Sequence, residues 1–199
     1  MRPLPLIFYQ KSDVVLIARE LIGKKLFTCT LGEKITGGII TETEAYAGPQ
    51  DRASHAYGNR RTKRTEIMFA EGGVAYVYLC YGIHNLLNIV TNEKGIPHAV
   101  LIRAIIPTCG IELILQRRKK IHPTATLTNG PGSVCQALGI GLHHNGSSLT
   151  GPPLWIEDSD FPIDSNKIVA SPRIGIDYAG EDALLPWGFL YTQPNNLKN

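Results

Sequence analysis

The sequence predicts a single α+β domain over residues 1–199, with a mixed, mainly antiparallel curved sheet, flanking helices and a protruding β-hairpin. Strand-like segments recur along the whole chain, whereas helical spacing is limited to a few short segments. Hydrophobic residues make up 43% of the composition, which is enough to bury a sizeable core. We find no repeat, low-complexity segment or interdomain linker, so one domain is expected.

The first third of the chain is expected to hold one helix, two strands and a long loop. Ser12 is a candidate cap for a helix over residues 13–22, where apolar side chains lie near helical spacing. Residues 24–31 and 34–46 are typical of two strands joined by a turn. Residues 47–66 are polar and punctuated by Gly and Pro, and a loop of that length in a compact domain favours a functional role.

The middle of the chain predicts a β-hairpin, a buried strand and two helices. Residues 74–80 and 86–91 are expected to pair around YGIHN, and residues 98–106 form an apolar strand that contains one arginine. Residues 109–120 end in cations, as helices favour, and Pro131 suits the first turn of a second helix. Three short strands are expected after residue 140, at residues 154–157, 172–177 and 187–191.

The distribution of charge says more than the net charge of +3. Residues 60–64, together with Arg52, form one basic cluster, and residues 117–120 form a second. A basic cluster is compatible both with a solvated surface face and with a surface for an acidic partner, and the sequence alone leaves these alternatives open.

The cysteines and the N-terminus indicate a soluble, cytoplasmic protein with no metal site. There is no CxxC motif and no zinc-ligand spacing, so the thiols are expected to be reduced. The four cysteines are Cys29, Cys80, Cys109 and Cys135. The start of the chain is too short and too proline-broken for a signal peptide, and the longest apolar run, residues 74–81, is far too short to span a membrane.

Glu42 and Glu44 are the first candidates for chemistry. On a strand they share a face, with Cα atoms roughly 6.6 Å apart, and a carboxylate pair could serve glycoside hydrolysis. By spacing alone, a surface carboxylate beside a salt-bridge partner is the more ordinary interpretation. Tyr46 lies on the same face as Glu44 and would suit a flat, electron-poor ring, and His55 follows a turn that could bring it over that pocket. A lone histidine is more often structural.

The hairpin adds three tyrosines. Tyr76 and Tyr78 share one face of its first strand, and packing on the core is the favoured interpretation for Tyr76. Tyr81 is expected at the tip, where a large exposed aromatic side chain is costly unless it inserts into something. A DNA base stack is one such partner, because side-chain wedges can replace an extruded nucleotide.

Two polar residues sit in apolar strands. Asn88 needs hydrogen-bond partners, which could be backbone groups or a ligand edge. Arg103 is expensive to bury unless it is paired, and Glu44 is a candidate partner that Arg103 would keep ionised. A purely structural ion pair is an equally open interpretation. Taken together, the candidate residues would equip a pocket for an extruded base.

Five stretches, in order from about residue 5 to 190, closely resemble the alkyladenine (3-methyladenine) DNA glycosylase family. They are ETEAYAGPQDRASHAYG, MFAEGGVAYVYLCYGIHNLLNIV, AVLIRAIIP, NGPGSVCQALGI and SPRIGIDYAG. The resemblance implies one DNA glycosylase domain that acts as a monomer in base excision repair. Its partner would be double-stranded DNA with damaged purines, in the cytoplasm or, in a bacterium, at the nucleoid.

The resemblance also implies a role for each candidate residue. Glu44 would be the general base that activates the attacking water, which Arg103 and the backbone carbonyl of Ile174 would help to hold. Tyr46, His55, Tyr78 and Asn88 would contact the flipped base, with Asn88 disfavouring the amino group of guanine. Tyr81 would intercalate into the minor groove, and Arg60, Arg61, Lys63 and Arg64 are expected to contact the DNA backbone. No metal or organic cofactor is implied. The matched pocket segments contain no lysine apart from Lys63 in the basic run, so hydrolysis by water is expected rather than a Schiff-base lyase.

The sequence departs from the family pattern at three places. His84 stands where an aromatic residue is common, Ser133 stands where a lysine is frequent, and the segment after Gly180 matches poorly. Two other functions stay open. One is a catalytically silent nucleic-acid-binding module, and the other is a carbohydrate glycosidase that uses Glu42 and Glu44.

Overall fold

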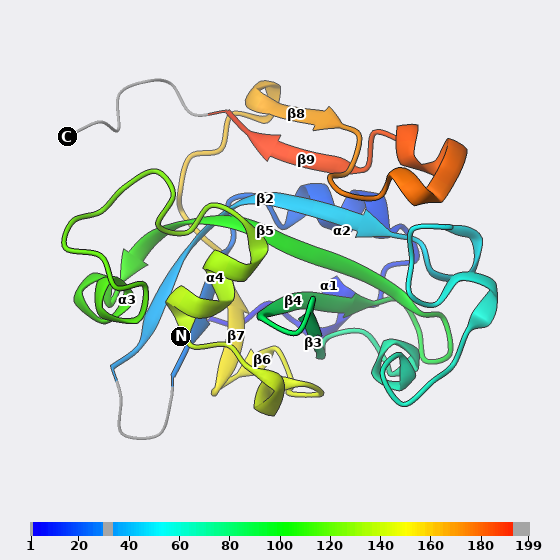
Figure 1. Ribbon diagram of the computed structural model, residues 1–199, viewed down its shortest axis with the longest axis horizontal. Coiled ribbons are helices and arrows are strands. Elements are labelled where there is room, and N and C mark those ends of the chain that lie inside the picture. The colour runs from blue at the N-terminus through cyan, green and yellow to red at the C-terminus, as the bar shows by residue number, and fades with distance from the viewer. Residues whose placement is uncertain (1, 30–33, 193–199) are drawn as a thin grey trace.

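The computed structural model describes residues 2–29 and 34–192, and in that part of the chain nine strands form one sheet (Figure 1). The order is β3-β4-β5-β2-β1-β7-β6, with β9 attached to β2 and β8 attached to β9. Every pairing between these strands is antiparallel, which confirms the predicted α+β class. The strands are β1 (Lys25–Thr28), β2 (Thr36–Tyr46), β3 (Ala75–Cys80), β4 (His84–Thr91), β5 (His98–Cys109), β6 (Thr150–Gly151), β7 (Leu154–Glu157), β8 (Ile168–Ser171) and β9 (Gly188–Tyr191).

Short helices flank the sheet. The α-helices are α1 (Leu6–Tyr9), α2 (Val14–Glu20), α3 (Ile111–Arg117) and α4 (Pro131–Leu138). The 3₁₀ turns are η1 (Gly48–Gln50), η2 (Tyr57–Asn59), η3 (Glu66–Phe69), η4 (Leu142–His144), η5 (Ser165–Lys167) and η6 (Asp177–Leu184). None of the helices in the described residues is long and apolar enough to cross a membrane.

The helix starts follow local chemistry. α2 is capped by Asp13, whose carboxylate accepts a hydrogen bond from the backbone N–H of Leu16 at 2.9 Å, so the prediction that Ser12 is the cap was wrong by one residue. α4 begins at Pro131, as predicted, and ends at Leu138. Gly139 caps it in the left-handed conformation (φ +68°) that glycine tolerates best.

Alternation of side chains along the strands gives the sheet two faces, one packed in the main core and one opposite it. Val77, Leu87, Ile89, Val100 and Ile102 are buried in the main hydrophobic core. Their neighbours in sequence on the same strands point to the opposite face, since successive strand residues alternate. The predicted hairpin is confirmed as β3 and β4, and β3 lies at the edge of the sheet (Figure 1).

The segment before η6 is not a strand, so the prediction for residues 172–177 was wrong. The strand lies just before it, as β8, and pairs with β9. Arg173 turns inward to a buried ion pair, and the backbone N–H of Ile174 binds a side chain instead of a neighbouring strand. A backbone whose polar groups serve a site cannot also complete a sheet ladder.

Two further differences are small. Helix α1 was not predicted, because four residues are too few to show a helical period. The predicted loop over residues 47–66 is present and contains two 3₁₀ turns, η1 and η2, while the turn predicted between the first two strands lies outside the described residues. In Figure 1 this loop (cyan) lies beside η6 (orange) at one end of β2 and β5.

Candidate active site

A cavity of about 680 Å³ opens on the face of the sheet opposite the main core. Strand register explains why residues from four strands meet there. Asn88 of β4 pairs with Tyr76 of β3 and with Leu101 of β5, and Leu101 in turn pairs with Glu44 of β2. Residues that are directly paired across neighbouring strands share a face. These four side chains therefore form one row, and all four line the cavity.

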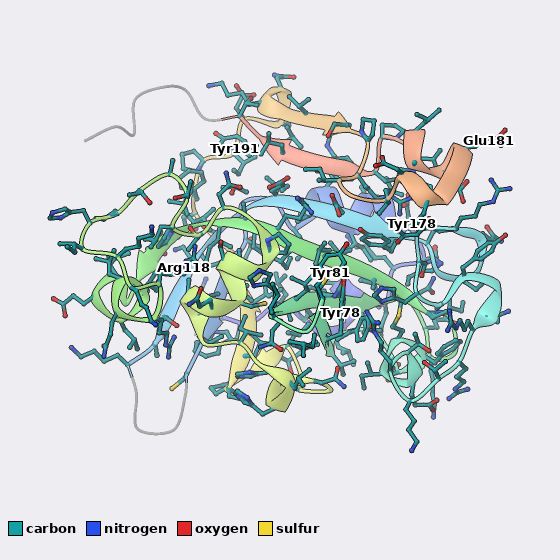
Figure 2. All side chains as sticks on the ribbon, viewed as in Figure 1. Tyr78, Tyr81, Arg118, Tyr178, Glu181 and Tyr191 are labelled. Atoms are coloured by element: carbon teal, nitrogen blue, oxygen red, sulfur yellow. The ribbon has the colours of Figure 1, made fainter. Side chains whose placement is uncertain are left out.

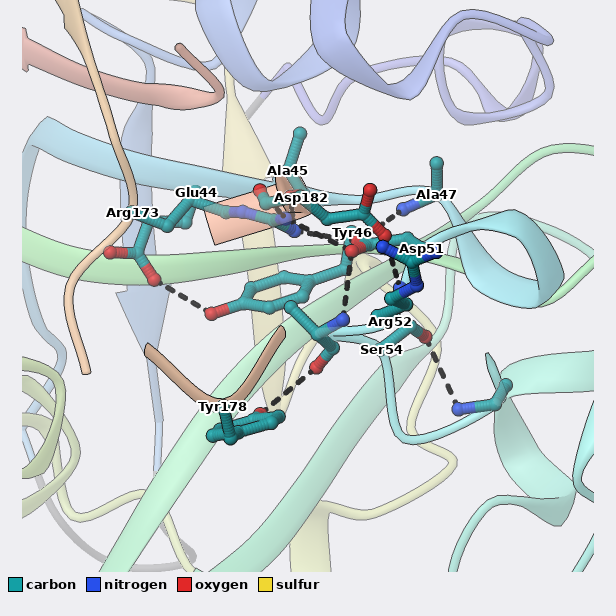
Figure 3. A network of polar contacts seen from close by, with 12 residues as sticks. Glu44, Ala45, Tyr46, Ala47, Asp51, Arg52, Ser54, Arg173, Tyr178 and Asp182 are labelled. Carbon is teal, nitrogen blue, oxygen red and sulfur yellow. Dashed lines mark hydrogen bonds and ion pairs between the residues drawn. The ribbon is translucent and has the colours of Figure 1, made fainter. Parts of the chain in front are cut away.

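Glu44 supplies the carboxylate of this row and is buried, at 1% exposure. One oxygen, Oε1, accepts a hydrogen bond from the backbone N–H of Ile174 at 2.7 Å. The other, Oε2, accepts one from the hydroxyl of Tyr46 at 2.8 Å, as Figure 3 shows. Nη1 of Arg103 lies 3.3 Å from Oε1. These three groups are hydrogen-bond donors or cations, which suits an ionised carboxylate.

Two opposing effects set the proton affinity of Glu44. Burial raises its pKa above the ordinary value, and the Arg103 guanidinium, the Ile174 N–H and the Tyr46 hydroxyl each lower it, with burial the larger effect. The result is a carboxylate with more proton affinity than an exposed one, held in place by fixed donors. That combination is what a general base requires.

Arg103 is shared between two carboxylates. Its Nε donates to Oε1 of Glu42 at 3.0 Å while Nη1 approaches Glu44. The predicted pairing with Glu44 is therefore present, and Glu42 joins it. The register between β2 and β5 shifts on either side of Glu42, so that Arg103 has no direct partner in the ladder. Glu42 is absent from the lining of the described cavity, which counts against a glycosidase that uses both carboxylates.

Burial beside Glu44 raises the pKa of Tyr46, so its hydroxyl stays protonated and donates. Its ring lines the cavity from the end of β2. The guanidinium of Arg173 lies 4.8 Å from the ring centroid.

His55, Tyr76 and Tyr78 form an aromatic cluster on the other side of the cavity. The rings of His55 and Tyr78 meet edge to face at 4.7 Å, and Tyr76 and Tyr78 are 5.3 Å apart. Nδ1 of His55 lies 2.9 Å from the Tyr76 hydroxyl, and Nε2 lies 3.3 Å from Nη2 of Arg64. A guanidinium only donates, so Nε2 must accept, and the His55 proton sits on Nδ1.

His55 is neutral at pH 7. Burial lowers its pKa, and the nearby charges of Arg64 and Arg60 lower it further, to about 4. Tyr76, expected only in the core, does pack in an apolar cluster, but it also lines the cavity and holds His55. The signal that could have revealed this was its shared face with Tyr78.

Asn88 and Tyr81 occupy opposite extremes of exposure. Asn88 is buried, and its amide donates to the backbone carbonyl of Tyr76 at 3.3 Å. Tyr81 is 91% exposed at the tip of the β3–β4 hairpin, with a positive φ of 50°. Figure 2 shows Tyr78 and Tyr81 on this hairpin, with Tyr178 nearby. Tyr78, Tyr81 and Tyr178 all line the cavity.

The four cations over residues 60–64 are not equivalent. Arg61 makes two hydrogen bonds to Glu66, at 2.8 and 2.7 Å, and Arg64 lies over the Tyr78 ring at 4.5 Å. Arg60 and Lys63 are exposed. A second cavity of about 400 Å³, lined by Arg52, Arg60 and Arg64 among others, shares His55 and Tyr178 with the first. The loop therefore joins the aromatic cavity to a basic surface.

Sequence reasoning missed a buried ion pair next to this cavity. Arg173 and Asp51 are 122 residues apart, and nothing in either segment signals the other. The two residues that depart from the family pattern, His84 and Ser133, both line the cavity. In the described residues, no group of three or more His, Cys, Asp or Glu side chains is placed to hold a metal ion.

A buried carboxylate beside a cluster of aromatic rings, at the edge of a basic surface, suits the glycosylase class of enzyme, which hydrolyses the bond between a planar base and its sugar. The chain belongs to the methylpurine-DNA glycosylase family, because the family model described as Methylpurine-DNA glycosylase (MPG) matches residues 7–195. It is accordingly a DNA glycosylase, a repair hydrolase that cleaves N-glycosyl bonds.

Several bacterial proteins are similar over nearly their whole length, and each carries the provisional name 3-methyladenine DNA glycosylase. One from Chlamydia felis is 51% identical over 188 residues, which cover 94% of this chain and 95% of that protein. One from Chlamydia pneumoniae is 50% identical over 192 residues (96% of each), and one from Bacillus cytotoxicus is 47% identical over 192 residues (92% and 93%).

Proposed function

We propose that this enzyme flips 3-methyladenine, 7-methylguanine and hypoxanthine nucleotides out of duplex DNA and hydrolyses their N-glycosidic bonds with a water activated by Glu44. The observation that carries the proposal is the position of Glu44, which is buried in the lining of an aromatic cavity and paired with Arg103. The names of the similar bacterial proteins support the first substrate.

The proposed reaction needs one base and one water. The water oxygen attacks C1′ as the bond to the purine nitrogen breaks, the leaving base takes the bonding electrons, and Glu44 accepts the water proton. Positive charge develops on the sugar, and a fixed carboxylate stabilises it. Arg103 and the backbone carbonyl of Ile174 are proposed to hold the water. An alkylated purine leaves as a neutral base, whereas hypoxanthine leaves as an anion that takes a proton from solvent water. The products are an abasic sugar and a free base.

The aromatic cavity would hold the flipped base. Alkylation at N3 or N7 makes a purine cationic, so it leaves readily and stacks well on tyrosine. Tyr46 and Tyr78 are the proposed stacking surfaces, with neutral His55 beside them. Asn88 would face the base edge and disfavour the amino group of guanine, because its buried amide has limited room for another donor.

The exposed tip and the basic loop would hold the DNA. Tyr81 is proposed to fill the gap left by the flipped nucleotide, and Arg60, Arg61, Lys63 and Arg64 to contact the phosphates. For this, Arg61 would exchange Glu66 for a phosphate, a small cost at an exposed ion pair. We propose that the enzyme acts as a monomer.

A base-release assay on a panel of damaged duplexes tests the substrate range. Duplexes carrying one 3-methyladenine, 7-methylguanine, hypoxanthine or normal guanine are incubated with enzyme, and free base and abasic sites are measured. We expect release of the first three and retention of guanine. Tight binding without release of any base would instead indicate a silent DNA-binding module.

A further inference from the structure

The Asp51–Arg173 pair is fully buried, with both side chains at 0% exposure, and it lies outside the lining of the described cavity. Its geometry is bidentate, since Nη1 of Arg173 lies 2.6 Å from Oδ2 of Asp51 and Nη2 lies 2.9 Å from Oδ1. Removing two charges from water is costly unless further hydrogen bonds satisfy both groups. The further bonds of this pair show what it holds.

Each member of the pair forms a hydrogen bond with the backbone on one side of Tyr46. Nη1 of Arg173 donates to the carbonyl of Ala45 at 2.9 Å, and Oδ2 of Asp51 accepts from the N–H of Ala47 at 3.1 Å (Figure 3). Oδ1 of Asp51 also accepts from the N–H of Ala53 at 3.0 Å, so the start of the long loop is tied to the same pair.

The guanidinium also supports the ring of Tyr46. It lies 4.8 Å from the Tyr46 centroid and 5.1 Å from that of Trp187. Tyr46 lines the cavity and Arg173 does not, so the guanidinium lies against the ring from outside the cavity. The ring that is proposed to stack on the base is thus supported from behind by a fixed cation and by both flanking peptides.

The same arginine fixes a donor to Glu44. Ile174 follows Arg173 directly, and its backbone N–H gives the 2.7 Å hydrogen bond to Oε1 of Glu44. The Ile174 side chain is 59% exposed, so its own packing contributes little to holding that peptide. The anchor is the buried side chain of Arg173, which also donates to the carbonyl of Asp182 at 3.1 Å.

We propose that Asp51 and Arg173 are positioning residues for hydrolysis, which hold the Tyr46 ring and the Ile174 N–H in fixed places relative to Glu44. This inference rests on the proposed function of Glu44 and Tyr46. It differs from a purely structural role, because a structural pair would set only the fraction of folded protein.

The acid limb of the pH–rate profile separates these two roles. Glu44 must be ionised to accept the water proton, so the rate falls as pH drops through its pKa. The Ile174 N–H favours the ionised form, and its loss raises that pKa, which moves the limb to higher pH. The other groups that face Glu44 are Arg103, Glu42 and Tyr46. Displacing Tyr46 would remove a second hydrogen bond that lowers the pKa of Glu44, so it would shift the acid limb in the same direction.

The experiment uses Asp51→Asn, which keeps the shape of the side chain, and Arg173→Lys, which keeps the charge. Ile156→Ala is the matched control, because Ile156 is buried in β7 and is not part of the described cavity lining. Single-turnover release of hypoxanthine is measured per folded molecule across pH 5 to 9, with thermal melting alongside.

For both pair variants we expect a rate about 10- to 100-fold lower, as misplaced groups produce, and an acid limb shifted to higher pH. Ile156→Ala should melt earlier but keep the wild-type rate and limb. Wild-type rates and limbs in the folded pair variants would overturn the inference, and so would variants that never fold, because the pair would then be purely structural. A wild-type enzyme that releases no base, or a Glu44→Gln variant of full activity, would instead defeat the proposed function.

Discussion

At the scale of single residues, the proton on His55 is fixed by its neighbours. Arg64 can only donate to Nε2, and burial makes a second proton costly. His55 therefore presents a neutral ring with its Nδ1–H directed at the Tyr76 hydroxyl. A neutral ring also avoids repelling a cationic purine, which matters in a cavity proposed to hold alkylated bases.

We predict that His55 titrates near pH 4 and that Arg64→Gln raises this value toward the ordinary 6.5, because one of the charges that lower it is removed. NMR titration of the histidine rings measures both. Arg61→Gln is the matched control, since Arg61 is held by Glu66 and should leave His55 unchanged. A wild-type pKa of 6 or more would contradict the arrangement.

The same group contributes to stability. Folding lowers the pKa of His55 from 6.5 to about 4, so between those values the unfolded chain binds a proton that the folded chain does not. The free energy of unfolding should therefore fall as pH drops through this window and be unaffected by His55 above it. Denaturation by urea at several pH values, for wild type and His55→Gln, isolates this contribution.

At the scale of elements, the β3–β4 hairpin carries both cavity-lining tyrosines and an exposed aromatic tip. Alternation places Tyr76 and Tyr78 on the cavity face, and the turn leaves Tyr81 almost fully exposed. The positive φ of Tyr81 is unusual for a bulky residue and costs on the order of 1–2 kcal/mol. A costly conformation that exposes an aromatic ring favours a functional explanation over a structural one.

Tyr81→Ser should lower the equilibrium fraction of flipped nucleotide, because a serine cannot fill the vacated base stack. A fluorescent base analogue next to the lesion reports that fraction. Tyr81→Phe should behave as wild type, and Ile83→Ser tests whether any exposed apolar residue at the tip would serve, since Ile83 is also exposed. Equal flipping by Tyr81→Ser and wild type would rule out the wedge.

Elements also show what local sequence can and cannot predict. The hairpin, the long loop and α4 follow from alternation, Gly/Pro content and Pro131, all of which act within a few residues. The strand predicted over residues 172–177 is absent, because Arg173 and Ile174 serve partners 122 and 130 residues away. Local patterns carry no information about such partners.

At the scale of the whole molecule, one sheet brings distant segments into a single site. The row of Tyr76, Asn88, Leu101 and Glu44 depends on register across four strands. Sequence spacing identified Glu44 and Arg103 as a candidate pair, but the sharing of Arg103 with Glu42 depends on the local shift in register. The Asp51–Arg173 pair could not be predicted either, because its two residues lie 122 positions apart in segments outside the strands.

The basic loop is predicted to make DNA affinity fall with salt, because each phosphate contact releases counterions. Replacing Arg60 and Lys63 with Gln should reduce the slope of log K against log salt by about one per residue. Arg61→Gln should reduce it less, since Arg61 must first leave Glu66. Lys25→Gln, on β1, is the control. Filter binding or anisotropy at several salt concentrations measures the slopes. An affinity that does not change with salt would mean that the cluster is a solvated surface face and does not contact DNA phosphates.

The most direct test of the account is single-turnover excision of hypoxanthine by wild type and Glu44→Gln, with binding of the same duplex measured in parallel. Glutamine fills the same space but cannot accept the water proton. We predict that excision falls by about 10²- to 10⁴-fold while the dissociation constant for the lesion duplex stays close to that of wild type. Excision by Glu44→Gln at the wild-type rate would contradict the assignment of Glu44 as the base.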